Sequence, residues 1–219
     1  MCKGTLQAVS ITVLLLILAG LSSCVPSPPV IESITPTSGT IGTEILIRGS
    51  GFTPDNNDIA FTHPDINFHG SNTAYLNHIS SPDGKTLRFT LPDVLGACAF
   101  SQMKLYEACP DVGIWVPIGP ITIAVVNRNG MSNGVIFERI KSEIELAQEI
   151  IYQSPAYREL IEILDEIVRR TGGFVSVGIR KCEEKICIMV WIEKDVPELS
   201  RKIPAQIEGF EVRIERWGH

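Results

Sequence analysis

Short runs of alternating apolar and polar residues, separated by turn-forming residues, occupy the chain from about residue 30 to residue 140 and constrain its fold most. Leu87, Phe89 and Leu91 alternate with Arg88 and Thr90, as expected for a strand with one buried face and one face in water. The turns between the runs are rich in Gly, Pro, Asn and Asp, which suit positive φ angles and pre-bent backbone. Strands of this length at this spacing predict a β-sandwich. We expect its strands at residues 30–35, 44–48, 58–62, 86–91, 121–127 and 134–138.

The hydrophobic period changes near residue 140. Apolar residues then recur at helical spacing over 140–151 and again over 157–168, which predicts two amphipathic helices. Between them, Ser154 suits an N-cap and Pro155 the first helical position, and Gly172 suits the end of the second helix. On the exposed side of that helix, Asp165 with Arg169 and Glu166 with Arg170 are expected to pair four residues apart.

Three strands are expected after the helices, at residues 174–182, 186–192 and 210–214, with a short Pro-containing linker before the last. A turn at Glu184 and Lys185 would place Cys182 opposite Cys187 and would pair apolar residues across the first two strands. The predicted fold class is therefore mainly β plus α+β. A β-sandwich over residues 30–139 would be followed by a small α+β domain over residues 140–219.

The N-terminus has the pattern of an export signal. Lys3 precedes an apolar run over residues 13–21, which is too short to span a bilayer, and the run ends in Leu21-Ser22-Ser23-Cys24. This ending resembles the lipobox of bacterial lipoproteins, in which the Cys is lipidated and the chain is cut just before it. The resemblance implies a signal peptide over residues 1–23 and lipidation of Cys24; the alternative is ordinary signal cleavage, with Cys24 a bystander.

A lipidated Cys24 would anchor the protein to a membrane rather than span it, because stable anchoring needs at least two lipid signals and a multiply acylated Cys supplies them. The residues at 24–29, CVPSPP, would form a Pro-rich tether that resists both helix and sheet. The expected location is the cell membrane or the outer membrane, facing the periplasm or the extracellular space.

The charge balance is acidic, with a formal net charge of −6 at pH 7, and this argues against a nucleic-acid partner. Residues 30–140 contain 6 basic and 10 acidic residues, whereas residues 141–219 contain 12 and 15. The change in composition falls where the hydrophobic period changes and supports a domain boundary there.

Four cysteines follow Cys24, and an even number in an exported chain favours disulfides. Cys98 and Cys109 would form one local bridge and Cys182 and Cys187 another. A four-cysteine zinc site is the weaker alternative, because neither pair has a C-x-x-C spacing and the two domains would have to converge.

Several segments in the first domain resemble a known family. Residues 29–43 read PVIESITPTSGTIGT, residues 45–52 read ILIRGSGF, residues 81–87 read SPDGKTL and residues 126–133 read VNRNGMSN. In this order they resemble the IPT/TIG domain, and the resemblance implies an immunoglobulin-like fold and suggests a binding role. The chain departs from the family pattern in a longer polar loop at residues 63–73 and in an insertion at residues 93–118 that contains Cys98 and Cys109.

The insertion is the best candidate for a partner-binding surface, because loops on a rigid scaffold often carry recognition. A bridge closing a loop of about a dozen residues contributes about 3 kcal/mol in the chain-entropy model, which is enough to order it. The candidate binding residues are Phe100, Tyr106 and Trp115, and the neighbouring apolar residues are Met103, Leu105 and Ile114. The alternative is that these side chains fold back onto the sheet.

Candidate metal ligands are sparse and irregularly spaced. The polar residues that invite a metal hypothesis are His63, His69, His78, Asp55, Asp58 and Asp65, with Asp55 and Asp58 the best candidates. Their spacing matches no ligand pattern, and Asp-rich loops in such domains are usually turn chemistry, so we expect no metal. The glycines near residue 50 are followed by a Phe-Thr-Pro turn rather than a helix, so a nucleotide loop and a bound cofactor are not expected.

No nucleophile signature is found in the second domain, where Glu183 and Glu184 are expected at a solvated hairpin tip. The sequence therefore predicts a non-enzymatic, membrane-anchored lipoprotein of the cell envelope that binds or supports an unknown protein or glycan partner. An accessory or regulatory subunit of a membrane-associated enzyme is the alternative. An independent hydrolase is a third hypothesis, and it lacks a convergent set of catalytic residues.

Overall fold

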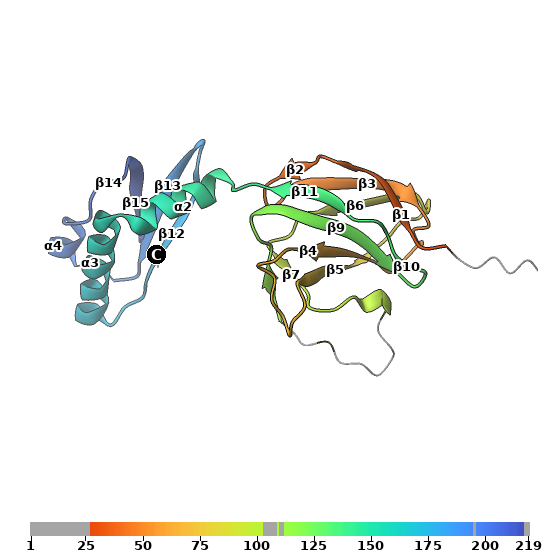
Figure 1. The fold of residues 1–219 in the computed structure, drawn as a ribbon. Coiled ribbons are helices and arrows are strands. Elements are labelled where there is room, and N and C mark those ends of the chain that lie inside the picture. Colours follow the sequence, from red (N-terminus) through yellow and green to blue (C-terminus); the bar gives the residue numbers. More distant parts are fainter. Residues whose placement is uncertain (1–26, 103–108, 110–111, 195, 217–219) are drawn as a thin grey trace, which may run out of the picture.

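The computed structural model describes residues 27–102, 109, 112–194 and 196–216. The predicted signal peptide over residues 1–23 lies outside the described residues, as do Cys24 and residues 25–26 of the predicted tether. Figure 1 shows a strand-rich part followed by a part in which helices pack on a smaller sheet. Among the described residues, no helix is long and apolar enough to cross a membrane.

Two sheets packed face to face form the strand-rich part (Figure 1). One sheet has the order β1 (Val30–Thr35), β3 (Glu44–Ser50), β6 (Thr86–Thr90). The other has the order β2 (Ser38–Gly39), β11 (Val135–Arg139), β9 (Gly119–Asn127), β4 (Asn57–Thr62), β5 (Thr73–Ile79), and β10 (Gly130–Met131) pairs with β9. The predicted sandwich is therefore confirmed, and the six expected strands are present with small shifts at their ends.

The core lies between the two sheets and is built from alternating inward-facing residues. In β3 the buried residues Ile45 and Ile47 alternate with partly or fully exposed neighbours, as an amphipathic strand requires. Phe61 of β4 meets Phe89 of β6 edge to face across the core, with ring centroids 6.2 Å apart. Ile66 is buried in this core too. The loop at residues 63–73, which was predicted to be polar, therefore contributes one apolar side chain to the core.

The insertion at residues 93–118 carries the two-stranded sheet of β7 (Val94–Leu95) with β8 (Ile114–Trp115) and the short 3-10 helix η1 (Phe100–Gln102). Part of it folds back onto the larger sheet, because Ala99 packs on Ala60, Ala124 and Val126 on the outer face of that sheet. The Cys98–Cys109 disulfide that the sequence predicts is present, with Cα atoms 5.9 Å apart.

Strand β1 is fixed where the described chain enters the sandwich. Asn133 accepts a hydrogen bond from the Ile31 backbone N–H at 2.8 Å and donates to the Ile31 carbonyl at 3.1 Å. Just before β1, the chain passes so close to Gly51 that a Cβ there would lie 3.1 Å from the Pro29 Cα, so this position suits glycine. The entry point of the chain therefore lies beside the loop that follows β3.

The second part contains helices α2 (Glu143–Gln153), α3 (Pro155–Thr171) and α4 (Pro197–Ser200). Its sheet has the order β12 (Val175–Cys182), β13 (Lys185–Ile192), β15 (Phe210–Arg216), β14 (Gln206–Ile207), and β13 runs parallel to β15. Leu160 and Ile167 of α3 pack with Ile188 and Val190 of β13 in a core separate from that of the sandwich. The linker predicted between the last two strands contains α4 and β14, which the sequence did not indicate.

Both helix boundaries follow the predicted capping chemistry. Ser154 is the N-cap of α3, its hydroxyl accepts from the Ala156 N–H at 3.2 Å, and Pro155 occupies the first turn. Gly172 ends the helix in the left-handed conformation with φ of 60°.

Of the two predicted ion pairs on α3, only one is present. Glu166 pairs with Arg170, as predicted. Arg169 also pairs with Glu166, at 2.9 Å, so the prediction that it pairs with Asp165 is wrong. The spacing of three residues is as close on a helix surface as the spacing of four.

The hairpin of β12 and β13 differs from the prediction by two residues. Its turn is at Glu183 and Glu184, with Cys182 opposite Lys185 and Cys187 opposite Arg180. Glu183 adopts a left-handed φ of 61° in the turn. The predicted disulfide between Cys182 and Cys187 is present, with Cα atoms 5.8 Å apart, but it joins diagonal rather than opposite positions.

An ion pair joins the end of the sandwich to the first helix. Arg139, the last residue of β11, is 4% exposed and donates from Nη2 to Glu145 Oε1 on α2. Glu145 also completes a capping box with Ser142, which starts the helix. The transition from strand to helix therefore occurs within four residues, from Arg139 to Glu143, where the sequence pattern predicted it.

Candidate functional site

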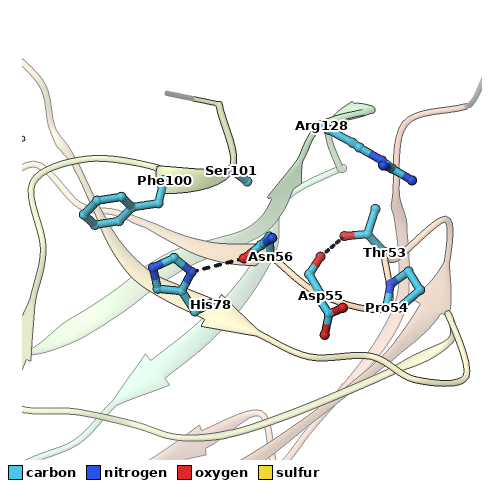
Figure 2. Close-up of a pocket in the computed structure, with 8 residues that line it drawn as sticks. All are labelled: Thr53, Pro54, Asp55, Asn56, His78, Phe100, Ser101 and Arg128. Atoms are coloured by element: carbon cyan, nitrogen blue, oxygen red, sulfur yellow. Dashed lines mark hydrogen bonds between the residues drawn. The ribbon is translucent and has the colours of Figure 1, made fainter. Parts of the chain in front are cut away.

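A cavity of about 620 Å³ opens at the end of the sandwich where the described chain enters, and Figure 2 shows the side chains around it. Its lining comes from the loop after β3, the end of β5, the start of η1 and the turn after β9. The lining residues are Thr53, Pro54, Asp55, Asn56, His78, Phe100, Ser101 and Arg128.

Buried amide side chains bond to the loop after β3 that lines this cavity. Asn57 and Asn127 are fully buried, and Asn127 Nδ2 donates to Asn57 Oδ1 at 3.2 Å. Asn57 Oδ1 accepts from the Thr53 N–H at 2.9 Å, and Asn127 Nδ2 donates to the Gly51 carbonyl at 3.0 Å. Because buried polar groups are costly when unpaired, this network holds the two loops in fixed positions.

A buried carboxylate fixes the other side of the cavity. Asp58 is fully buried, and its Oδ2 accepts from the Ser101 backbone N–H at 2.6 Å. Its Oδ1 accepts from the His78 backbone N–H at 3.2 Å. Burial raises the pKa of the nearby Tyr75 phenol, and the Asp58 carboxylate raises it further. Asp58 therefore positions η1 and His78 through their backbones.

An aromatic pair forms one wall. The rings of Phe100 and His78 stack with centroids 5.2 Å apart and planes inclined by 29°, and Phe100 is 45% exposed. His78 Nδ1 lies 3.2 Å from Asn56 Oδ1, as the dashed line in Figure 2 shows. Asn56 and His78 both have left-handed φ angles, of 59° and 62°, a conformation that is uncommon in residues other than glycine and that clusters at functional sites.

The polar side chains around the cavity differ in what they offer a ligand. Arg128 and Asp55 are exposed, and Arg128 can only donate hydrogen bonds whereas ionised Asp55 can only accept them. The two hydroxyls are already engaged: Thr53 donates to the Asp55 carbonyl at 2.6 Å and Ser101 to the Val126 carbonyl at 3.2 Å. Neither hydroxyl donates to His78, so the arrangement suits recognition better than nucleophilic catalysis.

The three predicted binding residues have different outcomes. Phe100 lines the cavity. Trp115 is 72% exposed on β8, where it pairs with Val94, and it does not line the cavity. Tyr106 lies outside the described residues, as do Met103 and Leu105.

The residues considered for a metal are dispersed. Asp55 and His78 line the cavity, whereas Asp58 is buried with its oxygens accepting from the Ser101 and His78 backbone N–H groups. His63 and Asp65 face each other elsewhere, with Nδ1 and Oδ2 3.7 Å apart, while His69 packs against Phe68. In the part of the chain that the structure describes, no group of three or more His, Cys, Asp or Glu side chains is placed to hold a metal ion.

Sequence reasoning did not identify the remaining lining residues, Thr53, Pro54, Asn56, Ser101 and Arg128. They come from three loops that are distant in the sequence. The Asx-rich turn at residues 54–58 and the Asn127-Arg128-Asn129 turn were visible as turn signals, but neither signal shows that the two turns meet.

One of the comparisons with known proteins, the match to a family model, agrees with the sandwich. The family model described as the IPT/TIG domain matches residues 29–103. Among solved structures, the gamma-CGTase from alkalophilic Bacillus clarkii shows 25% identity with a TM-score of 0.31, covering 52% of this chain and 12% of that enzyme's chain. A search of curated proteins gives no match. Residues 29–103 therefore carry an IPT/TIG domain, an immunoglobulin-like module.

Proposed function

We propose that this chain is a non-catalytic lipoprotein of the cell envelope, anchored to a membrane through lipid on Cys24, and that its IPT/TIG module binds a protein or glycan partner. The cavity of about 620 Å³ carries the binding part of this proposal. Pockets of about 300 to 1,000 Å³ with a few polar groups are the usual form of ligand sites. IPT/TIG domains are immunoglobulin-like modules suited to binding or structural roles, which fits a pocket made of loops on a rigid scaffold.

Sequence features support the anchoring part of the proposal. The apolar run and the Leu21-Ser22-Ser23-Cys24 ending match a lipoprotein signal, and two disulfides fit an oxidising compartment. From Cys24 to Pro28, four residues can span at most about 14 Å. Because Pro28 lies against Gly130 at the cavity end of the sandwich, a lipid on Cys24 would hold this end close to the membrane surface.

The anchoring proposal is tested by native mass spectrometry and membrane fractionation of the full chain, expressed in a bacterium that processes lipoproteins. We expect cleavage before Cys24, a fatty-acylated N-terminus and two internal disulfides. The Cys24→Ser variant should leave the membrane fraction, whereas Cys2→Ser should stay in it, because Cys2 lies in the removed segment. An intact, unprocessed chain in the soluble fraction with four reduced thiols would refute anchoring.

The alternative role, as an accessory subunit of a membrane-associated enzyme, has one structural observation in its favour. The α2 residues Leu146, Ile150 and Tyr152 are each about half exposed, and such apolar side chains suit a protein contact. Crosslinking in membranes distinguishes the two roles. Stoichiometric recovery of a single enzyme, lost in Leu146→Glu but kept in Phe100→Ala, would favour the accessory role.

A further inference from the structure

We propose that the cavity beside Phe100 and Arg128 is a binding site for a neutral saccharide. The sugar ring would lie against the Phe100 and His78 wall, and its hydroxyls would bond to Arg128, Asp55 and Asn56. This proposal rests on the binding role proposed above and names the class of ligand.

The aromatic wall offers a fixed apolar surface. The Phe100 backbone N–H donates to Asn77 Oδ1 at 3.4 Å, and the next N–H, of Ser101, donates to the buried Asp58 carboxylate at 2.6 Å. The His78 ring backs the Phe100 ring, so the exposed aromatic surface is held from two sides. An aromatic face is electron-rich and attracts the polarised C–H groups on the apolar face of a pyranose ring.

The polar groups suit hydroxyls, which both donate and accept. Arg128 supplies donors, ionised Asp55 supplies acceptors, and the Asn56 amide supplies both. Neither Arg128 nor Asp55 forms an ion pair with another of the residues that the structure describes. Figure 2 shows Arg128 on the same side as Thr53 and Asp55, away from the Phe100 ring, so a ligand between them would meet an apolar wall on one side and polar groups on the other.

The charges disfavour the other ligand classes. An anion that Arg128 attracts would be repelled by Asp55, which lines the same cavity. A cation would face Arg128. An apolar ligand would have to desolvate Arg128, Asp55 and Asn56 without satisfying their hydrogen bonds, which is costly. A neutral ligand rich in hydroxyls avoids all three penalties.

Two sources could present such a ligand at this site. A saccharide could be free in solution or could be the head group of a glycolipid. The cavity opens at the end of the sandwich where Pro28 and Pro29 pack against Gly130 and Gly51. With Cys24 lipidated, that end would lie within reach of head groups in the same membrane.

Titration calorimetry on the full, detergent-solubilised chain tests the proposal. The neutral probes are lactose, cellobiose and chitobiose, and the charged probes are sialyllactose and inorganic phosphate. We expect at least one neutral disaccharide to bind with a Kd below about 10 mM and the charged probes to bind more weakly. Vesicles that carry lactosylceramide, compared with plain vesicles of the same lipid, distinguish the head-group source from the free one.

Matched variants locate the binding. Phe100→Ala and Arg128→Ala should each raise the Kd for the saccharide about tenfold or more. Trp115→Ala removes an even more exposed aromatic side chain outside the cavity and should leave the Kd unchanged. Near-ultraviolet circular dichroism and the melting temperature of each variant test whether the fold is retained. The further variant Phe100→Leu keeps an apolar side chain at this position while it removes the aromatic face.

Three outcomes would overturn the saccharide proposal: no neutral probe binding at about 20 mM, stronger binding of phosphate or sialyllactose, or equal loss in the Trp115 variant. Capture of a protein partner that Arg128→Ala abolishes, without any binding of sugar, would also overturn it while leaving the proposed binding role intact. Failure of lipidation, measured separately by mass spectrometry, would affect anchoring alone.

Discussion

At the scale of single residues, Asp83 shows how one carboxylate holds a turn. Its Oδ1 accepts from the backbone N–H groups of Lys85 at 2.9 Å and Thr86 at 2.8 Å, and from the Ser81 hydroxyl at 3.2 Å. These bonds, led by that from the Lys85 N–H, lower the pKa of Asp83 from its ordinary value of 3.8 to about 2. The turn lies within the SPDGKTL segment of the IPT/TIG domain and precedes β6.

This lowered pKa predicts an acid-dependent contribution to stability. Because the pKa of Asp83 is lower in the folded chain than in the unfolded one, its contribution is complete above about pH 4 and is lost as the pH falls toward about 2. We expect the difference in unfolding free energy between the wild type and Asp83→Asn to shrink over this interval. Carbon-13 NMR titration of the Asp83 carboxyl measures the pKa directly, and a peptide of residues 79–88 serves as the unfolded control. Equal midpoints in protein and peptide would show that the turn does not perturb this carboxyl.

At the scale of elements, the junction between α2 and α3 depends on one side chain. Ser154 is 3% exposed, and its hydroxyl donates to Glu208 Oε1 at 2.8 Å while it accepts from the Ala156 N–H. It therefore caps α3 and also ties the helix to the turn between β14 and β15. Loss of an N-cap costs about 0.5 to 2 kcal/mol in comparable helices.

We expect Ser154→Ala to destabilise the chain by about 1 to 2 kcal/mol in urea denaturation. Ser33→Ala, at an exposed position of β1, is the matched control and should change stability by less than about 0.5 kcal/mol. A double-mutant cycle with Glu208→Ala separates the contribution of the Ser154–Glu208 hydrogen bond from that of the N-cap bond to Ala156. Indistinguishable losses in the two serine variants would argue against the capping role.

Elements with a strong pattern could be predicted from the sequence, whereas their pairing could not. The six sandwich strands and both long helices follow from periodicity and capping residues. The register of β12 against β13 was wrong by two residues, because a slip of two keeps every side chain on the same face and so leaves the apolar alternation unchanged. The turn decided the register, through the left-handed Glu183. Strand β5 was missed, because its central residues Tyr75 to Asn77 are all partly buried and show no clear alternation.

Three of the eight residues that line the cavity were singled out from the sequence, but not as members of one site. Phe100 was proposed for binding, and Asp55 and His78 for a metal, on separate grounds. The structure brings these three together because the buried Asp58 bonds to the backbones of both η1 and β5. A contact of that kind, between residues 43 positions apart, leaves no trace in local pattern.

At the scale of the whole molecule, the described chain has two main hydrophobic cores. One lies within the sandwich, and the other lies between the helices and the sheet that contains β13. The first contains Ile47 and Phe61, and the second contains Leu160 and Ile188. These separate cores support the predicted boundary near residue 140. The second part has about 80 residues, a size at which a single core is marginal and a disulfide adds useful stability.

We expect residues 27–141 and residues 140–219 to fold as separate polypeptides. Their amide NMR spectra should overlay on that of the full chain except close to Arg139 and Glu145, which lose their ion pair. Reduction of the Cys182–Cys187 disulfide should destabilise the second fragment by about 2 kcal/mol in the chain-entropy model. A disordered spectrum for oxidised 140–219 would mean that the second part requires the sandwich to fold.

The chain enters the sandwich at Val30 and leaves it after Arg139, at the opposite end in Figure 1. The end of β11 pairs in parallel with β2, Glu138 with Ser38 and Arg139 with Gly39. The chain therefore leaves the sandwich beside β2 and away from Val30. Tension between a lipid attachment and the helical part would therefore act along the strands. The hydrogen bonds between β1 and β3 would then be loaded together in shear rather than broken one at a time, so we expect the sandwich to resist pulling in this direction.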